Sequence, residues 1–309
     1  MVSVCVITFN SAKYIIETLD SVRQQSFSDI ELIISDDCST DDTVILCQKW
    51  LDRYKNLFVK VKLITSIKNA GVVTNINRAI SVSHGEWIKF VAGDDVLLNT
   101  CIQDNLDFIA KNSKCLIVQS DVMKYQDSFE AENLILGDSR YKVFLHNNVT
   151  AKEQFRILCF ECPVMAPSTF IKRNLLEEMG GFDSSFSIED YPMWLKITSL
   201  GYKIYYLNKV TIKYRIHDTS IMHSCSFNYY NLKLEKTLKD IKRKYVYPFI
   251  KRYDLLFWES EMTYSIKYFV IYYLFQNKNS FITRFIGKAL SCFNFYLIKK
   301  RIKSLLICF

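Results

Sequence analysis

Three pairs of neighbouring acidic residues mark the first two-thirds of the chain: Asp36-Asp37, Asp94-Asp95 and Glu189-Asp190. The first two pairs follow apolar runs rich in β-branched residues, so we expect them at the carboxyl edge of a sheet, where open α/β folds bind ligands. Carboxylates held together without matching bases repel one another unless a cation or a substrate proton lies between them. Together the pairs indicate a metal-assisted enzyme that acts on a phosphorylated ligand, although each pair taken singly is also typical of helix caps and turns.

The elements that position the first two pairs alternate between strand and helix. Hydrophobic patterning predicts strands at 2–7, 30–35, 59–65 and 87–91. Cap and turn residues predict helices from Asn10 or Ser11 to about Gln25, over 42–54, and from the turn at 69–71 to about His84. Strands joined by short connections through helices specify a largely parallel sheet flanked by helices.

The third pair lies in a less regular part of the chain. The pattern predicts a strand at 115–125, an irregular polar segment at 127–150, a helix at 152–160, a strand at 168–171 and a helix at 173–179. Glu189-Asp190 then stands at the mouth of a helix over 191–200, and two short strands at 203–207 and 210–215 lead to His217.

The chain of 309 residues, half of them apolar, is long enough for one large α/β domain with an appendage. We expect a domain over 1–220 and a helical region over 221–309. The ten cysteines are scattered, and the single Cys159-x-x-Cys162 has no second pair nearby, so a structural zinc site is a minor alternative to reduced thiols. No basic leader precedes the first strand, and the apolar stretch 268–275 is far shorter than the roughly 20 residues of a membrane span. These features predict a cytoplasmic protein.

Positive charge is concentrated in the C-terminal region. From Asn228 onward there are 16 Lys and Arg against 5 Asp and Glu, whereas residues 1–227 hold 24 against 27. Trp, Tyr and Phe are interleaved with basic clusters such as 242–244 and 299–301. This composition is typical of a region that docks on an anionic membrane surface, of a plain helical cap, or of a nucleic-acid-binding region. Because the chain has no RNA- or DNA-binding motif, we expect no nucleic acid partner and favour the membrane surface.

A series of short motifs, in order along residues 2–220, resembles the family 2 glycosyltransferases, the inverting GT-A enzymes that build bacterial surface polysaccharides. The motifs are Thr8-Phe9-Asn10, Asp36-Asp37 with Ser39-Thr40-Asp41, Asn69-x-Gly71, Gly85-Glu86-Trp87-Ile88 before Asp94-Asp95, Gly180-Gly181-Phe182-Asp183 before Glu189-Asp190, and Tyr214-Arg215-x-His217. The resemblance implies a GT-A fold, that is, an α/β fold with a Rossmann-like, mostly parallel sheet. It further implies a nucleotide-sugar half over about 1–100, an acceptor half over about 101–220, and a C-terminal helical extension that varies between family members.

The resemblance also implies a donor site. Its nucleotide-sugar-binding residues would be Thr8, Phe9, Asn10, Asp36, Asp37, Asn69, Gly71, Asp94 and Arg215. Thr8 with Asp36 or Asp37 would contact uracil and ribose, and Gly71 would let the backbone approach the nucleoside. A purely structural turn at Gly71 is the alternative, and Arg215 is either a phosphate partner or an ordinary charge at a strand edge.

Asp94 matches the last carboxylate of the family's Asp-x-Asp motif, the direct ligand of a divalent cation. The resemblance implies that Asp94 and His217 bind Mn²⁺ or Mg²⁺, which prefer hard oxygen ligands. The sequence departs from the family at Ala92, where the first Asp of the motif is absent. Asp95 either supports this site or caps the next helix.

Asp190 matches the family's catalytic base, and Glu189 would orient the acceptor or the base. A carboxylate within hydrogen-bond reach of the acceptor hydroxyl takes its proton as the new bond forms. Both residues also suit the N-terminus of a helix, where the helix dipole favours negative charge.

The sequence thus predicts a metal-dependent hexosyltransferase for O-antigen or capsule synthesis. We expect a nucleotide-sugar donor, UDP-linked, a lipid-linked or growing saccharide acceptor, and a peripheral location on the inner face of the cell membrane. A nucleotidyltransferase is one alternative, but it needs a Gly-rich basic phosphate loop, which residues 8–11 do not provide. A non-catalytic sugar-nucleotide-binding subunit is the other, and Ala92 is its only support.

Overall fold

The computed structural model describes residues 1–135, 149–217, 228–296 and 298. The chain forms two compact units: Met1–Leu158 with Cys162–His217, and Cys159–Glu161 with Asp218–Phe309. Two features named by the sequence, the basic cluster 299–301 and most of the irregular segment 127–150, lie outside the described residues. The division of the first unit into donor and acceptor halves near residue 100 stays a prediction.

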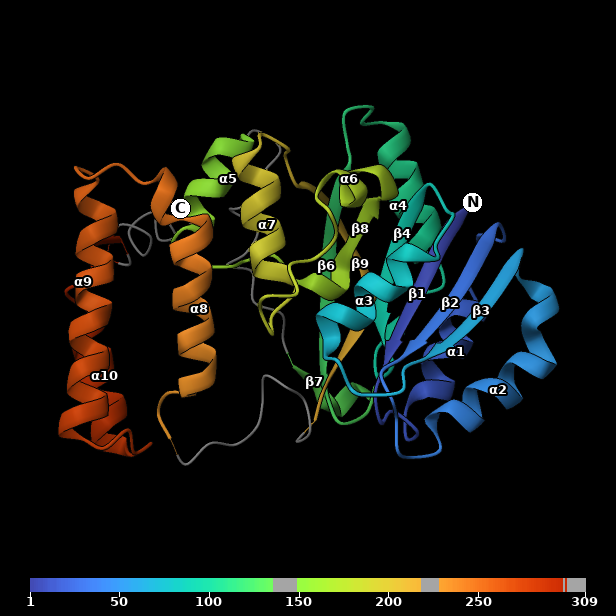
Figure 1. Cartoon of the computed structure of the whole chain (residues 1–309), viewed down its shortest axis with the longest axis horizontal. Helices are drawn as coiled ribbons and strands as arrows, with labels where there is room; N and C mark the ends of the chain where they lie inside the picture. Colours follow the sequence, from blue (N-terminus) through green and yellow to red (C-terminus); the bar gives the residue numbers. More distant parts are fainter. Residues whose placement is uncertain (136–148, 218–227, 297, 299–309) are drawn as a thin grey trace. The chain divides into compact units, whose positions relative to one another are not determined.

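Four parallel strands form the first half of the sheet, in the order β3-β2-β1-β4 (Figure 1). They are β1 (Val2–Thr8), β2 (Ile30–Asp36), β3 (Lys60–Thr65) and β4 (Trp87–Ala92). All seven residues of β2 are buried, because this strand lies inside the sheet and both of its faces are covered. The predicted, mostly parallel sheet is confirmed.

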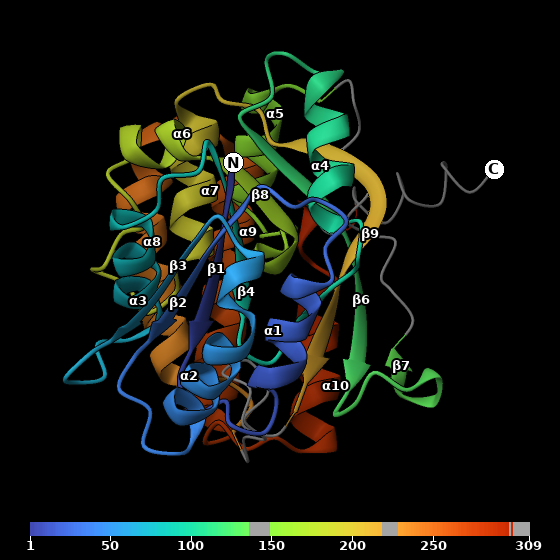
Figure 2. The same cartoon turned by 90° about the vertical axis from the view of Figure 1, so that its right-hand side faces the viewer.

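The crossover helices are α1 (Ile15–Arg23), α2 (Thr43–Tyr54) and α3 (Val72–Ser81). Because parallel crossovers are right-handed, connections that run in opposite directions along the sheet place their helices on opposite faces. Accordingly, α1 packs with α2, while α3 contacts β1 and β2 from the other face (Figure 2). The cap expected at Asn10 or Ser11 lies about one turn before the first residue of α1, Ile15, and the carbonyl of Ser11 accepts the N–H of Ile15 at 2.9 Å.

The second half of the sheet is mixed. It contains β5 (Val96–Leu97), β6 (Ile117–Gln126), β7 (Leu134–Ile135), β8 (Thr169–Lys172) and β9 (Tyr205–Ile216), in the order β4-β8-β6-β9-β5 with β7 paired to β6. The helices here are α4 (Cys101–Ala110), α5 (Ala151–Leu158), α6 (Arg173–Glu178) and α7 (Asp190–Ser199). The two strands expected at 203–207 and 210–215 are one strand, β9, because an irregularity in its pairing with β6 absorbs the polar step between them.

The described part of the second unit is helical, as expected. Its helices are α8 (Leu232–Tyr245), α9 (Leu255–Phe269), which runs into a π-helical turn at Val270–Leu274, and α10 (Phe281–Ser291). Side chains of Asn231, Asp254 and Ser280 cap the three helices. Among the residues that the structure describes, no helix is both long enough and apolar enough to cross a bilayer.

Candidate active site

The carboxyl ends of β1, β2 and β4 meet at one edge of the sheet. Thr8 at the end of β1 is in register with Asp36 of β2, and Ile7 with Ala92 of β4. Just past β4, the N–H of Gly93 donates to the carbonyl of Ile7 at 2.9 Å. The first two acidic pairs therefore follow neighbouring positions of one sheet edge, the edge at which parallel α/β sheets bind ligands.

The first acidic pair shapes the loops at this edge. The carboxylate of Asp36 accepts hydrogen bonds from the hydroxyl of Ser39 and from its N–H, the latter at 2.9 Å. The carboxylate of Asp37 accepts from the N–H groups of Ala70 and Gly71, at 3.0 and 2.7 Å. Both acidic side chains are buried. The pair thus fixes the loop after β2 and the turn before α3.

The turn at Asn69 to Gly71 requires a glycine for conformational reasons. Gly71 has a φ of 87° as the residue that begins α3, and the Asn69 carbonyl oxygen Oδ1 accepts its N–H at 3.1 Å. A Cβ placed on Gly71 would meet no atom within 4 Å. The constraint is therefore the backbone angle, which residues with a Cβ rarely adopt.

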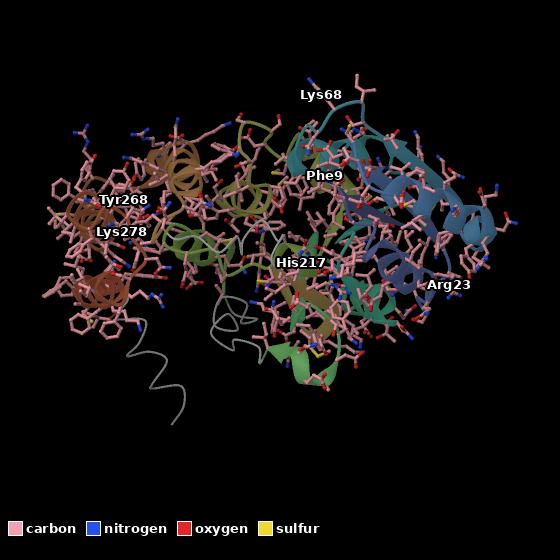
Figure 3. The ribbon with its side chains drawn as sticks, turned by 90° about the horizontal axis from the view of Figure 1, so that it is seen from below. Phe9, Arg23, Lys68, His217, Tyr268 and Lys278 are labelled. Atoms are coloured by element: carbon pink, nitrogen blue, oxygen red, sulfur yellow. The ribbon has the colours of Figure 1, made fainter. Side chains whose placement is uncertain are left out.

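Thr8, Phe9 and Asn10 take three different positions after β1. The Oγ1 of Thr8 is buried and has no hydrogen-bond partner among the described residues, whereas Phe9 is 45% exposed (Figure 3). Asn10 is held in the protein, because its Oδ1 accepts the N–H of Thr40 at 2.8 Å. An unpaired buried hydroxyl destabilises a fold, so Thr8 is the member of the three that most needs a ligand or a water.

Asp94 and His217 meet across the sheet. The Nε2 of His217, just past β9, lies 2.9 Å from the Oδ2 of Asp94, just past β4. Asp95 turns inward instead: it is fully buried, and its Oδ1 accepts the N–H of Arg215 at 2.9 Å. Burial first, and then the charge of Asp94, raise the pKa of Asp95 well above its usual range. Asp95 therefore ties the turn to β9, and Asp94 faces the site.

Arg215 connects the turn after β4 to neighbouring elements through its hydrogen bonds. It is 3% exposed, and each of the three nitrogens of its guanidinium donates to a protein group. The partners are the Asp94 carbonyl at 2.9 Å, the Asp127 carbonyl at 2.6 Å and the Glu17 carboxylate. The Cζ of Arg215 also lies over the rings of Tyr14 and Phe129, 4.4 and 3.9 Å from their centroids. Of the two roles left open for Arg215, these contacts favour a structural one over a phosphate contact.

The third acidic pair stands at the N-terminus of α7. Glu189 is the residue before the helix and Asp190 its first residue, and the Oδ1 of Asp190 accepts the N–H of Tyr191 at 2.7 Å. Burial raises the pKa of Asp190 to about 6. Burial, together with the charge of Asp190, raises the pKa of Glu189 to about 7. Carboxylates with such pKa values suit proton transfer near neutral pH.

One tyrosine shows that the second and third pairs share a neighbourhood. Burial raises the pKa of Tyr214 to about 12, and the added causes are the negative charges of both pairs, Asp94-Asp95 and Glu189-Asp190. Tyr214 belongs to β9, two residues before the end of that strand. The structure therefore brings together the residues expected to hold a cation and the residues expected to take a proton.

Sequence reasoning missed two residues of α3 that support this edge. Asn75 is buried, and its Nδ2 donates to the carbonyls of Ser35 at 2.9 Å and Thr8 at 3.3 Å. Arg78 pairs with Asp37 at 3.3 Å. The two residues lie three apart, on one face of the helix. The sequence did contain a signal for these two residues. Both are polar, and both lie on the helix face that the helical periodicity assigns to the sheet.

The residues present suit a divalent cation that is shared with a substrate. Within the described ranges, no group of three or more His, Cys, Asp or Glu side chains could form a complete cage. Asp94 and His217 offer one carboxylate and one imidazole. Mg²⁺ and similar ions are commonly held by one or two carboxylates together with substrate phosphates and water, so this pair fits such an ion only with a phosphorylated ligand in place.

Two relatives are similar to most of the chain. One is an uncharacterized glycosyltransferase of Haemophilus influenzae, 24% identical over 262 residues that cover 82% of this chain and 75% of the relative. The other is UDP-Glc:alpha-D-GlcNAc-diphosphoundecaprenol beta-1,3-glucosyltransferase WfaP of Escherichia coli, 28% identical over 233 residues that cover 72% of this chain and 79% of the relative.

Among solved structures, S. aureus TarS 1–349 in complex with UDP-GlcNAc is similar in fold. Its TM-score is 0.64 at 21% identity, over 88% of this chain and 75% of that one. The family model described as glycosyl transferase family 2 matches residues 3–180, more than half of the chain. The mixed sheet described above is thus a GT-A fold, and the chain belongs to glycosyl transferase family 2.

Proposed function

We propose that this protein is an inverting, metal-dependent hexosyltransferase that uses a UDP-sugar and a lipid-linked or growing saccharide. The observation that carries the proposal is the meeting of Asp94 with His217, at 2.9 Å, in the same neighbourhood as Glu189-Asp190. A cation-binding pair and a proton acceptor are the two groups that such a transfer needs. The name of the Escherichia coli relative, which joins UDP-Glc to a diphosphoundecaprenol-linked acceptor, supports the choice of donor and acceptor.

In the proposed donor site, the nucleoside binds over the edge formed by Thr8, the Asp36-Asp37 loops and the Asn69–Gly71 turn. The unpaired Oγ1 of Thr8 offers a hydrogen bond to it. Asp36 and Asp37 act mainly by holding the backbone of these loops in place, since their carboxylates already accept loop N–H groups. Because such loops are already ordered before the ligand binds, less conformational entropy is lost on binding.

In the proposed reaction, the third pair, Glu189-Asp190, supplies the base. An acceptor hydroxyl attacks the anomeric carbon, its proton passes to a carboxylate oxygen of Asp190, and the bond from that carbon to the diphosphate breaks with its electrons leaving on the diphosphate. Attack opposite the leaving group inverts the anomeric centre. A bound Mn²⁺ or Mg²⁺, held by Asp94 and His217, would stabilise the charge that develops on the diphosphate. Glu189 shares the base's burial and orients the acceptor.

The proposal also gives the basic C-terminal region a role. A lipid-linked acceptor is presented at a membrane surface, and a region rich in Lys, Arg and aromatic residues suits an anionic leaflet. We therefore infer a peripheral place for the enzyme at the inner face of the membrane, in O-antigen or capsule synthesis.

The test is a screen of nucleotide-sugars, measured as binding and as donor hydrolysis with and without Mn²⁺. We expect a UDP-sugar to bind and to be hydrolysed slowly, with Mn²⁺ required for both. The Asp190→Asn variant serves as the matched control, because it should bind the same donor without turning it over. Hydrolysis that continues undiminished in excess chelator would overturn the role given to Asp94 and His217.

A further inference from the structure

An apolar stripe runs along the exposed face of α9 and its π-helical extension. Residues of this α9 stripe recur every three or four positions, the spacing that places side chains on one face of a helix. They are Leu255, Trp258, Met262, Ile266, Phe269 and Tyr273, with exposed fractions between 36% and 79%. Amphipathic helices normally bury such a face, so within the described part of the chain this one is a surface without a partner.

Helix α10 adds a second set of exposed apolar side chains. Phe281 is 83% exposed, and Ile282 and Phe285 are 60% and 66% exposed. The two helices belong together, because α10 packs on α9 and Asn294 donates to the hydroxyl of Ser260 at 2.9 Å. Figure 3 shows rings projecting from the orange and red helices of this unit, where Tyr268 and Lys278 are labelled.

The described acidic residues of the same unit all accept hydrogen bonds from other residues of that unit. Every described Asp and Glu is half-buried and accepts a hydrogen bond from its own unit. The donors are Tyr296 to Glu161, Tyr264 to Glu235, Arg243 to Asp240, the N–H of Phe257 to Asp254, Thr263 to Glu259, and Lys242 and Tyr247 to Glu261. Two of these carboxylates, Asp240 and Glu261, are also paired with the basic residues Arg243 and Lys242, which offsets their charge.

The basic residues of the unit are placed in the opposite way. All but Lys242 and Lys267 of the described Lys and Arg are exposed. Lys251 and Arg252 stand immediately before the α9 stripe and Lys278 just after it, while Arg284 and Lys288 alternate with the exposed apolar residues of α10. Exposed basic residues thus flank the α9 stripe in sequence, and on α10 they share a helix face with exposed apolar side chains.

We propose that the α9 stripe enters the headgroup region of an anionic lipid bilayer and that the surrounding Lys and Arg bind the lipid phosphates. A second copy of the chain would also cover apolar side chains, but it would bring two positively charged faces together, and an anionic bilayer neutralises that charge. Aromatic residues at the boundary between acyl chains and water, with cations on the polar side, are the pattern of helices that lie in a membrane interface. The inference rests on the proposed function only in its purpose, since a lipid-linked acceptor explains why the enzyme docks; the docking is measured without any sugar.

The experiment is flotation of the full chain with vesicles of phosphatidylcholine alone and of phosphatidylcholine with phosphatidylglycerol. The wild type should float with the anionic vesicles and far less with the neutral ones. Salt at about 1 M, where the screening length falls to about 3 Å, should weaken this binding without abolishing it. The remainder is the contribution of the apolar stripe.

The stripe variant Met262→Glu/Phe269→Glu tests that remainder. Both side chains are already more than half exposed, so the fold should tolerate the changes, and a melting curve checks this. Binding at high salt should fall at least about tenfold, because burying one large apolar side chain is worth about that factor. The matched control is Ile45→Glu, which places the same charge on an apolar residue of α2 that is 53% exposed; it should float like the wild type.

Two outcomes would overturn the inference. One is equal flotation of the stripe variant and the Ile45→Glu control at high salt. The other is a wild-type dimer, seen by light scattering without lipid, that the stripe variant converts to a monomer while neither protein floats. Failure to use any nucleotide-sugar would leave the vesicle result unchanged, so loss of the proposed function and loss of the docking site are told apart.

Discussion

The role proposed for Asp190 in catalysis conflicts with what its burial does for stability. Burial raises its pKa to about 6 and that of Glu189 to about 7. A carboxyl whose pKa is higher in the folded state than in the unfolded state contributes stability below the unfolded pKa. That contribution is lost as the pH rises through the folded pKa. The ionised form that the reaction requires is therefore the form that the fold favours least.

From this conflict we predict that Asp190→Asn stabilises the protein at pH 8 while abolishing transfer. The gain should be on the order of 3 kcal/mol, because the pKa is raised from 3.8 to about 6 and each unit corresponds to about 1.4 kcal/mol. It should shrink toward zero below about pH 4, where both states bind the proton in the wild type. Denaturant unfolding at both pH values measures it. Asp107→Asn, an exposed carboxyl of α4, should change little at either, and a destabilised Asp190→Asn at pH 8 would contradict the argument.

The same pKa values predict the pH dependence of turnover. The donor turnover of the wild type should rise as the pH passes from about 5 to about 8, because the acidic pair loses its protons over that range. Initial rates with saturating donor and acceptor show it. A rate that is flat down to pH 5 would mean that neither carboxyl acts as the base.

The prediction for Asp94 concerns the binding of UDP and not the transfer reaction. It is partly exposed and meets His217, so Asp94→Asn should leave the melting temperature almost unchanged. It should remove the increase in UDP affinity that Mn²⁺ gives the wild type, because a neutral amide is a poor ligand for a hard cation. Calorimetric titration with UDP, with and without Mn²⁺, compares the two proteins. An increase in affinity that persists in the variant would exclude Asp94 as a ligand.

At the scale of elements, the two halves of the sheet differed in how well the sequence predicted them. The parallel half was predicted because local patterns decide it: runs rich in β-branched residues end at cap or turn residues, and short helices follow. In the second half, the strands at 115–125 and 168–171 and the helices at 152–160, 173–179 and 191–200 were predicted to within two residues. The continuity of β9 was not, because β9 pairs with β6 across an irregularity and with the two-residue strand β5, and neither feature has a local signal. Asp94 and His217 were found as a pair through their motifs. The role of Arg215 was not, because its partner Glu17 lies 198 residues away in sequence.

Arg215 therefore links β9 to the turn after β4 and to α1. We predict that Arg215→Lys loses on the order of 2 kcal/mol of stability and weakens donor binding. A lysine keeps the charge, but it cannot donate in three fixed directions or stack on the rings of Tyr14 and Phe129. Unfolding and UDP titration measure the two effects. Arg243→Lys, at an exposed ion pair of α8, is the control and should lose little. A variant with normal stability and lost affinity would instead assign Arg215 to the phosphates.

At the scale of the whole molecule, the residues proposed for catalysis and the region proposed for attachment belong to different units of the chain. Residues 1–227 carry a slight excess of acids and all the proposed catalytic groups, whereas the region from Asn228 onward carries 16 basic residues against 5 acidic ones. If the second unit only attaches the enzyme to a surface, each function should be removable without the other. Attachment raises the local concentration of a membrane-borne acceptor and has no effect on a dissolved one.

The stripe variant Met262→Glu/Phe269→Glu should therefore hydrolyse the donor, and glycosylate a water-soluble acceptor, at the wild-type rate. Its rate on the same acceptor group anchored in anionic vesicles should fall about tenfold, in step with its loss of vesicle binding. Asp190→Asn should show the reverse pattern: full flotation with vesicles and no transfer to either acceptor. Initial rates for the two acceptors, measured beside flotation of the same preparations, test both halves of this expectation. A stripe variant that loses both rates equally would show that the second unit takes part in the chemistry, because a pure attachment defect cannot slow transfer to a dissolved acceptor.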